Sequence, residues 1–356
     1  MESKFDFSNW DKTNNLFKNN DVQSKMIASS VIENAPEVTF TIPSYRRADV
    51  IQETIYSILQ QKTNYKFIIM VIDDSGDDES VEKSVLEIIK SNKNIVLYKN
   101  VKNLGQAENW NRCIELAKTP WVILVHDDDM LCNNYLESVL PVAKRSNCSE
   151  LGVFQYKYDL LKHKDDSAKK FNANQAFAQK ILSIIRRRSP FYVHPQDIFQ
   201  FITPSPGCWL INKDKAIKNG GFDPDFDVTL DGVFHFRNIV YGHVVIVPDF
   251  LMVRRVEENT FLKNDAQIQV IDMLYHFGLN MIKQNPQFSN KYYKIILDIS
   301  IIHLGRGINA KYNGKININA LLNSYGVNKY LLMLPSKIIF LLNCMFLSKL
   351  LFRKKL

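Results

Sequence analysis

Between residues 37 and 126 the chain alternates short apolar runs with helix-like segments, and this feature most constrains its fold. The apolar runs are EVTFTIP (37–43), KFIIMVID (66–73), NIVLYK (94–99) and WVILVH (121–126). The segments 49–61, 79–90 and 105–118 between them favour helices, as the helical spacing of Val50, Ile51, Ile55, Ile58 and Leu59 illustrates for the first. Strands that alternate with helices form a parallel sheet with helices packed on it. The sequence therefore predicts an α/β fold.

The pattern continues less regularly after residue 150. We expect strands at 151–158 and 208–212, a strand pair around 244–253, and helices at 229–241, 265–283 and 291–304. The polar, basic segment 162–188 and the proline-punctuated stretch up to Pro206 predict an excursion from the core.

Composition narrows the class of protein. A hydrophobic content of 46% with only 13 Gly and 12 Pro excludes a disordered or collagen-like chain. Five scattered cysteines and an N-terminus without a signal-peptide pattern predict a protein of the reducing cytoplasm. The net charge of +8 favours anionic partners such as nucleotide phosphates. Because the Lys and Arg residues are dispersed, we expect no binding of nucleic acid.

Two of the predicted strands end in acidic clusters, Asp73-Asp74-Ser75-Gly76 and His126-Asp127-Asp128-Asp129. Open α/β sheets bind ligands beyond the carboxyl ends of their strands, so both clusters should face one crevice. Taken alone, the first cluster favours a helix cap. Three adjacent carboxylates in the second repel one another unless a cation such as Mg²⁺ or Mn²⁺ neutralises them, and a solvated acidic turn is the alternative. A lone histidine such as His126 is usually structural.

Four motifs in order resemble the family 2 glycosyltransferases of the GT-A fold, over roughly residues 37–260. They are TIPSYRRADVIQETIYSILQQ, FIIMVIDDSGDDES, NVKNLGQAENWNRCIELAKTPWVILVHDDDML and GGFDPDFDVTLDGVFHFRNIVYG. The resemblance implies a Rossmann-like, mostly parallel sheet flanked by helices. It divides the chain into an N-terminal extension (1–36), a catalytic domain (37–260) with a nucleotide-sugar-binding half (37–150) and an acceptor half (151–260), and a helical C-terminal region (261–356).

The resemblance also implies roles for particular residues. Those expected to hold the donor are Pro43, Ser44, Tyr45, Asp73, Asp127 and Arg255; those expected to hold Mn²⁺ or Mg²⁺ are Asp128 and Asp129; the expected base is Asp231. A carboxylate base suits the reaction, because the acceptor hydroxyl must lose a proton as it attacks the sugar. A helix N-cap is the structural alternative for Asp231. His235, one turn further on, either supports Asp231 or is a solvated residue of the same helix face.

The chain departs from the family pattern in three places. His126 stands where the first Asp of Asp-x-Asp-Asp is usual, which makes Asp128 the leading metal ligand. The usual Glu-Asp pair is Leu230-Asp231. The common Tyr-Arg-x-His reads Arg254-Arg255-Val256-Glu257, so the Arg is kept, the His is lost, and Glu257 is an alternative oxygen ligand.

The function that the resemblance implies is inverting transfer of a sugar from a nucleotide-diphosphate sugar to a hydroxyl of a glycan or lipid-linked acceptor, in surface polysaccharide synthesis. A nucleotidyltransferase acting on sugar phosphates is one alternative, although TIPSYRRAD lacks the glycine-rich phosphate loop it would use. A catalytically inactive binding module of the same fold is the other.

The C-terminal segment 330–356 is apolar, interrupted by Lys and Asn, and ends in Arg353, Lys354 and Lys355. Its run 338–347 is shorter than the ~20 apolar residues that cross a bilayer. We expect this segment to lie on the inner face of the cell membrane as a peripheral contact. The alternatives are a helix packed on the catalytic domain and an oligomer contact.

Overall fold

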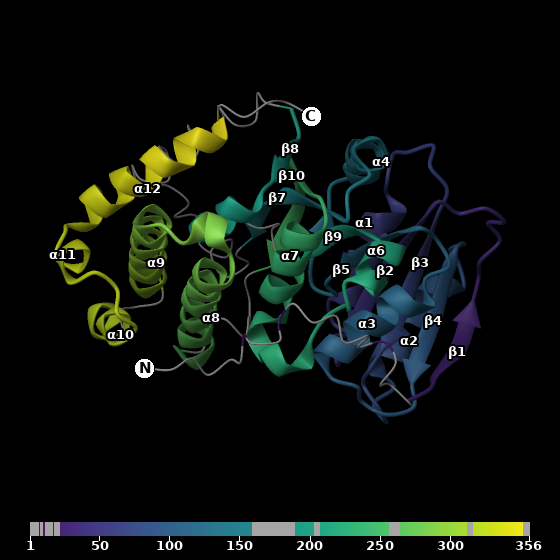
Figure 1. Ribbon diagram of the computed structural model, residues 1–356. Coiled ribbons are helices and arrows are strands. Elements are labelled where there is room, and N and C mark those ends of the chain that lie inside the picture. The colour runs from purple at the N-terminus through teal and green to yellow at the C-terminus, as the bar shows by residue number, and fades with distance from the viewer. Residues whose placement is uncertain are drawn as a thin grey trace, which may run out of the picture.

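Ten strands of the chain form one sheet. The computed structural model describes residues 7, 10, 17, 22–158, 189–202, 207–255, 264–311 and 316–351. The sheet order is β1-β4-β3-β2-β5-β9-β7-β10-β6, and β8 also pairs with β10 (Figure 1). The strands are β1 (Ser24–Ser29), β2 (Val38–Ser44), β3 (Phe67–Asp73), β4 (Ile95–Asn100), β5 (Trp121–Val125), β6 (Met130–Leu131), β7 (Glu150–Tyr158), β8 (Phe191–Val193), β9 (Cys208–Asn212) and β10 (Val244–Arg255).

Strand direction follows from the pairing. β4, β3, β2 and β5 pair in parallel, and β7 pairs in parallel with β10. β9 runs antiparallel between β5 and β7, so β7 and β10 point the same way as the first four strands. Six of the ten strands therefore share one direction. This confirms the α/β fold with a mostly parallel sheet.

Both faces of the central strands are covered, which explains why their sequences are continuous apolar runs instead of alternating ones. Every residue of β2 and β5 is buried. Phe40, Ile42 and Ile123 pack in one cluster with side chains of α1, α2 and α4. Ile72 and Leu124 pack in the opposite cluster with side chains of α3, α6, α7, α8 and α9.

The helices connect the strands and extend the fold beyond them. They are α1 (Ile51–Leu59), α2 (Ser80–Ile89), α3 (Gln106–Leu116), α4 (Tyr135–Ser146), α6 (Lys213–Lys218), α7 (Leu230–Tyr241), α8 (Asn264–Gln284), α9 (Lys291–Lys311), α10 (Ile318–Ser324), α11 (Lys329–Leu332) and α12 (Ser336–Leu351). Short 3₁₀ turns are η3 (Pro195–Gln200), η4 (Pro224–Thr229) and η6 (Pro286–Phe288).

Helices α8 to α12 lie beside the sheet, at the end away from β1 (Figure 1). Their buried residues, among them Ile271, Ile302 and Ile339, belong to the same apolar cluster as α3 and α7. Trp10 joins this cluster and contacts Phe277 of α8 edge to face, with ring centroids 4.5 Å apart. Within the described part of the chain, no helix combines the length and hydropathy needed to cross a bilayer.

The expected elements are largely confirmed, with one correction. The predicted strand pair around residues 244–253 is the single strand β10, whose register shifts twice between Val247 and Met252 against β7. Pro248 lies in that interval and has no backbone N–H to donate to the neighbouring strand. It interrupts the apolar pattern, so the sequence of one bulged strand resembles that of two strands. The sequence analysis did not anticipate β1, β6, β8 and α4. The predicted excursion at 162–188 lies outside the described residues, and the division into domains stays a prediction.

Candidate functional site

The carboxyl ends of β2, β3 and β5 meet at one edge of the sheet. Ser44, the last residue of β2, is in register with Asp73, the last residue of β3. The Ser44 hydroxyl donates a hydrogen bond to Oδ2 of Asp127, just beyond β5, at 2.8 Å. The backbone N–H of Tyr45 donates to the same oxygen at 3.4 Å. The two acidic clusters therefore lie on either side of the end of β2, as the sequence predicts.

Asp73 is fully buried and only half satisfied. Its Oδ1 accepts the backbone N–H of Ser75 at 2.9 Å. Its Oδ2 has no hydrogen-bond partner among the described residues, and the nearest cation is the Lys99 ammonium at 3.7 Å. Burial raises the pKa of this carboxyl above its usual range. A buried carboxylate oxygen without a hydrogen bond is costly, so Oδ2 of Asp73 is able to accept a hydrogen bond from a ligand.

The neighbouring Asp74 stabilises the backbone instead. Its carboxylate accepts four hydrogen bonds from the end of β4 and the loop that follows it, two from the side chains of Asn100 and Asn103 and two from the backbone of Leu104 and Gly105, at 2.8–3.1 Å. Asp74 therefore anchors this loop, whereas one oxygen of the adjacent Asp73 carboxylate has no hydrogen-bond partner among the described residues.

The turn after β5 concentrates negative charge. Burial, reinforced by the neighbouring Asp128 carboxylate, raises the pKa of Asp127 to about 7 and raises that of Asp129 well above its usual range. Arg47 forms an ion pair with Asp128 at 3.8 Å. Arg255, at the end of β10, donates its backbone N–H to Oδ1 of Asp129 at 3.1 Å and its Nε to the Asp128 carbonyl at 3.2 Å.

Glycine is required beside this turn. The residue before β9, Gly207, has φ of +114°, and an added Cβ would lie 2.2 Å from Oδ2 of Asp129. A larger residue would be strained and would collide with the carboxylate. Its carbonyl also accepts the backbone N–H of His126 at 3.0 Å. Gly207 therefore lets the backbone pass close to Asp129.

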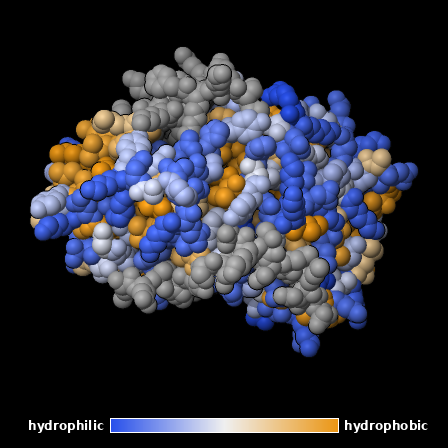
Figure 2. All heavy atoms as spheres, in the orientation of Figure 1, coloured by the Kyte–Doolittle hydropathy of each residue, from blue (hydrophilic) through white to orange (hydrophobic). Residues whose placement is uncertain are grey.

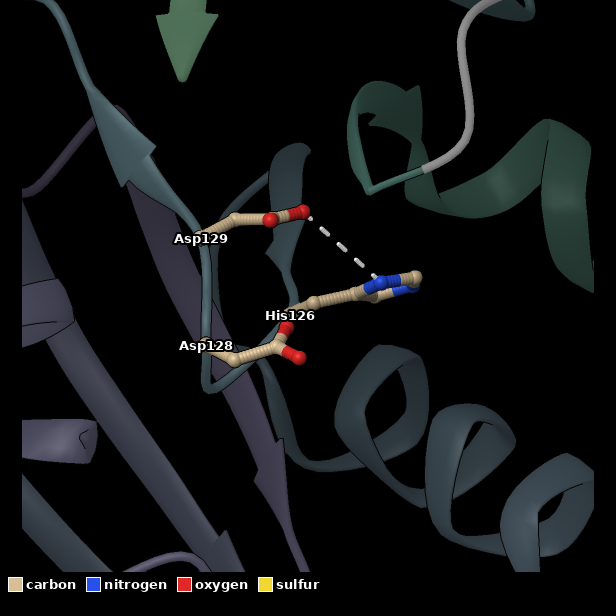
Figure 3. Close-up of side chains that lie close together, drawn as sticks. All are labelled: His126, Asp128 and Asp129. Atoms are coloured by element: carbon tan, nitrogen blue, oxygen red, sulfur yellow. Dashed lines mark ion pairs between the residues drawn. The ribbon is translucent and has the colours of Figure 1, made fainter. Parts of the chain in front are cut away.

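His126, Asp128 and Asp129 form a three-ligand group. Their ligand atoms all lie within 4.8 Å of one another, and Figure 3 shows the three side chains projecting from the same turn. The His126 ring lies against the rings of Trp110 and Trp209, with centroids 5.0 and 5.5 Å away. Burial lowers the pKa of His126 and favours the neutral imidazole, the form that binds a metal.

The residues present fit a divalent cation. The buried Oδ2 of Asp129 has no hydrogen-bond partner in the described part of the chain. Two carboxylates and one imidazole suit Mn²⁺, and carboxylates alone suit Mg²⁺. A cation would also relieve the repulsion among Asp127, Asp128 and Asp129. Sequence reasoning treated His126 as structural, because no spacing rule pairs one histidine with the two acids that follow it.

Asp231 lies in the first turn of α7, and its charge weakly opposes the lowering of the His126 pKa by burial. Its Oδ1 accepts the backbone N–H of Gly232 at 2.7 Å. The helix N-cap is Thr229 and not Asp231, although Asp231 still accepts a backbone N–H of the first turn; its role as the base stays a prediction.

His235 is buried, which excludes the second of its two alternatives, a solvated residue. Its Nδ1 lies 2.5 Å from Oε1 of Glu150 at the start of β7, and Asn238 donates to the other oxygen of Glu150 at 3.0 Å. Burial lowers the pKa of His235, but the Glu150 carboxylate and, less strongly, Asp231 outweigh it, and the net shift is upward. The pair joins α7, which carries Asp231, to the sheet.

A small, open hollow of about 120 Å³ lies beside Leu230, the residue before Asp231. Its lining comes from the start of α3, residues 104–108, together with Pro224 of η4 and Leu230 of α7. The sequence analysis did not find this hollow, because its two walls are more than a hundred residues apart along the chain.

The remaining predicted site residues differ in how exposed they are to solvent. Pro43 is buried within β2, whereas Tyr45 is exposed, with the Arg46 guanidinium 5.1 Å from its ring centre. Arg255 forms an ion pair with Glu53 of α1 at 2.5 Å. Glu257 lies outside the described residues. The sequence analysis missed Arg47 as a partner of Asp128, although it is part of the first quoted motif.

Comparison with known proteins identifies the family. The sequence model of Glycosyl transferase family 2 matches residues 39–217, which include the ends of β2, β3 and β5. The chain belongs to this family. Asp231 and Arg255 lie beyond the matched segment. A relative described as an uncharacterized protein, from Mycobacterium tuberculosis (strain CDC 1551 / Oshkosh), is 24% identical over 239 residues, 64% of this chain and 70% of that protein.

Solved structures show the same fold. The crystal structure of S. aureus TarS 1–349 in complex with UDP-GlcNAc matches with a TM-score of 0.57 and 13% identity, over 83% of this chain and 82% of that one. The mannosyltransferase PcManGT from Pyrobaculum calidifontis, in complex with GDP-Man and Mn²⁺, matches with a TM-score of 0.53 and 14% identity, over 93% and 90%. The chain has the GT-A fold.

Proposed function

We propose that this protein transfers a sugar from a nucleotide-diphosphate sugar to a hydroxyl of a glycan or lipid-linked acceptor, with inversion at the anomeric carbon. The observation that supports this most strongly is that one buried carboxylate oxygen of Asp73 and one of Asp129, at the same edge of the sheet of a family 2 chain, have no hydrogen-bond partner among the described residues. The similar structures contain UDP-GlcNAc or GDP-Man, which favours a nucleotide-sugar donor.

In this proposal the donor lies across the ends of β2, β3 and β5. Asp73 accepts hydrogen bonds from the nucleoside. Pro43, Ser44 and Tyr45 shape the wall beside it, and Ser44 fixes the orientation of Asp127 through their hydrogen bond. Asp127 lies next to the donor diphosphate.

Asp128 and Asp129, joined by His126, would hold Mn²⁺ or Mg²⁺. Such an ion supplies positive charge for the departing diphosphate. Arg255 adds a fixed cation, because its backbone holds Asp129 and its guanidinium lies against the acidic turn.

Asp231 is the proposed general base. It accepts the proton of the acceptor hydroxyl as that oxygen attacks the anomeric carbon from the face opposite the diphosphate. The hollow beside Leu230 offers the acceptor a place near this carboxylate. One displacement with one base inverts the anomeric configuration.

We also propose that the protein acts in surface polysaccharide synthesis as a cytoplasmic, peripheral protein on the inner face of the membrane. The basic C-terminal sequence, which includes Arg353, Lys354 and Lys355 outside the described residues, favours contact with anionic lipid. A lipid-linked acceptor would then lie close to the site.

Calorimetric titration of UDP- and GDP-sugars with Mn²⁺ tests the donor and metal assignments. The wild type should bind at least one donor in a metal-dependent way, and Asp128→Asn should lose that dependence. Asp214→Asn, the same change at an exposed position of α6, is the matched control and should bind as the wild type does. Metal-dependent binding that survives in Asp128→Asn would contradict the assignment.

A further inference from the structure

The C-terminal helix α12 buries one polar side chain, Asn343, next to the buried Ile339, and leaves apolar side chains exposed. Asn343 points inward and is 8% exposed, and its Oδ1 accepts the hydroxyl of the buried Ser300 on α9 at 3.1 Å. Ile338 and Leu341 lie on the other side of the helix and are 42% and 57% exposed. A helix whose outer side faces water shows the opposite pattern.

The exposed apolar surface continues beyond the helix. Tyr330 and Met333, in and just after α11, are 69% and 76% exposed. With Ile338 and Leu341 they form what we call the α12 face. In Figure 2, orange side chains gather at the upper left, where α12 lies in Figure 1. A contiguous apolar patch of this kind marks an interaction surface.

We infer that the α12 face docks on an anionic lipid bilayer. This face would be the surface that makes the membrane contact proposed above. The docking depends on that proposed contact, but it does not depend on the sugar-transfer reaction. Lys329 and Lys337 are exposed beside the face, and their side chains are long enough to reach lipid phosphates while their stems stay in the apolar layer. The sequence beyond α12 adds Arg353, Lys354 and Lys355.

The geometry favours lying on the membrane over crossing it. α12 has 16 residues, about 24 Å at 1.5 Å per residue, which is shorter than the ~30 Å hydrocarbon core. An interfacial helix with an apolar side and flanking lysines sinks partway into the headgroup region. A second copy of the chain fits the face less well, because docking like surfaces would bring the lysines of both copies together.

Vesicle flotation of the full chain tests the inference, with equimolar phosphatidylglycerol and phosphatidylcholine. Wild type should float. Leu341→Glu and Ile338→Glu should each lower the bound fraction about tenfold or more, because each removes apolar burial and adds charge that anionic lipid repels. Tyr56→Glu, the same kind of change at a 45% exposed position of α1, is the matched control and should float as wild type. Far-UV circular dichroism of the variants checks that they fold.

Several outcomes would overturn the inference. If folded Leu341→Glu and Ile338→Glu float as well as wild type while removal of residues 352–356 abolishes flotation, the membrane contact stands but the α12 face is not its surface. If wild type does not float and runs as a dimer that Leu341→Glu converts to a monomer, a second copy covers the face. Loss of donor turnover without loss of flotation would contradict the transfer function alone.

Discussion

Replacing Glu150 by Gln tests the buried pair that ties α7, the helix of Asp231, to the sheet. Glu150 is fully buried and His235 is 2% exposed, and the atoms Oε1 and Nδ1 lie 2.5 Å apart. The substitution removes the charge while keeping an oxygen for the hydrogen bond from Asn238. His235 then loses the largest influence that raises its pKa, and burial favours its neutral form.

The magnitude follows from the burial of both groups. Removing one partner of a buried ion pair costs roughly 3–5 kcal/mol of unfolding free energy. Because the Gln oxygen keeps Asn238 satisfied, we expect the lower end of that range, about 3 kcal/mol, at pH values below ~6.5. The pKa of His235 is raised in the folded state, so the pair's contribution is complete below the unfolded pKa of ~6.5 and is lost as the pH rises through the folded value.

Urea unfolding followed by circular dichroism, at a series of pH values from about 5.5 to 9, measures this effect. The gap in unfolding free energy between wild type and Glu150→Gln should be largest at the acidic end and should shrink as the pH rises. Glu33→Gln, which breaks the exposed pair with Lys66, is the control and should leave the urea midpoint nearly unchanged. A gap that is absent, or that grows with pH, would refute the reasoning.

Three further substitutions distinguish residues that bind the donor or the metal from residues that stabilise the fold. Asp73→Asn should weaken donor binding roughly tenfold to a hundredfold. It should also raise the urea midpoint, because burying an amide costs less free energy than burying a charge. Unchanged donor affinity would count against Asp73 as a donor-binding residue. Asp74→Ala should cost about 3 kcal/mol or more of unfolding free energy, because four donors lose their acceptor, and a wild-type midpoint would show that the loop is held otherwise. Gly207→Ala should leave the chain folded but weaken Mn²⁺ binding in calorimetry by displacing Asp129; wild-type Mn²⁺ affinity would remove Asp129 from the metal site.

The central strands could be predicted because burial on both faces makes them continuous apolar runs. β2, β3 and β5 begin and end within about a residue of the expected ranges. The shared edge of the two acidic clusters followed from the same pattern, since parallel strands end at one side of a sheet.

The elements that could not be predicted have weak local signals. β1 is a half-exposed edge strand with mixed polarity, and β6 has two residues. Their formation depends on a partner strand that already exists: β4 for β1, and β10 for β6. Local sequence carries little information on such pairing.

Part of the site also depends on long-range contacts. The resemblance implies that Asp73 holds the donor, but the residue pattern alone does not predict the role of Asp74, because the groups that bind its carboxylate come from residues 100–105. The partner of His235 is Glu150, 85 residues earlier. The resemblance to the family, in contrast, predicted that Ser44 and Asp127 lie in one site, and the hydrogen bond between them places them together.

Nucleoside diphosphate release with Mn²⁺, measured for wild type and Asp231→Asn with the donor that binds best, tests the central claim most directly. Our account predicts that the variant binds the donor as tightly as wild type in calorimetry and releases nucleoside diphosphate about 10²–10⁴-fold more slowly, the scale for loss of a positioned base. Equal release rates in the two proteins, or a transfer product with the anomeric configuration of the donor, would contradict it.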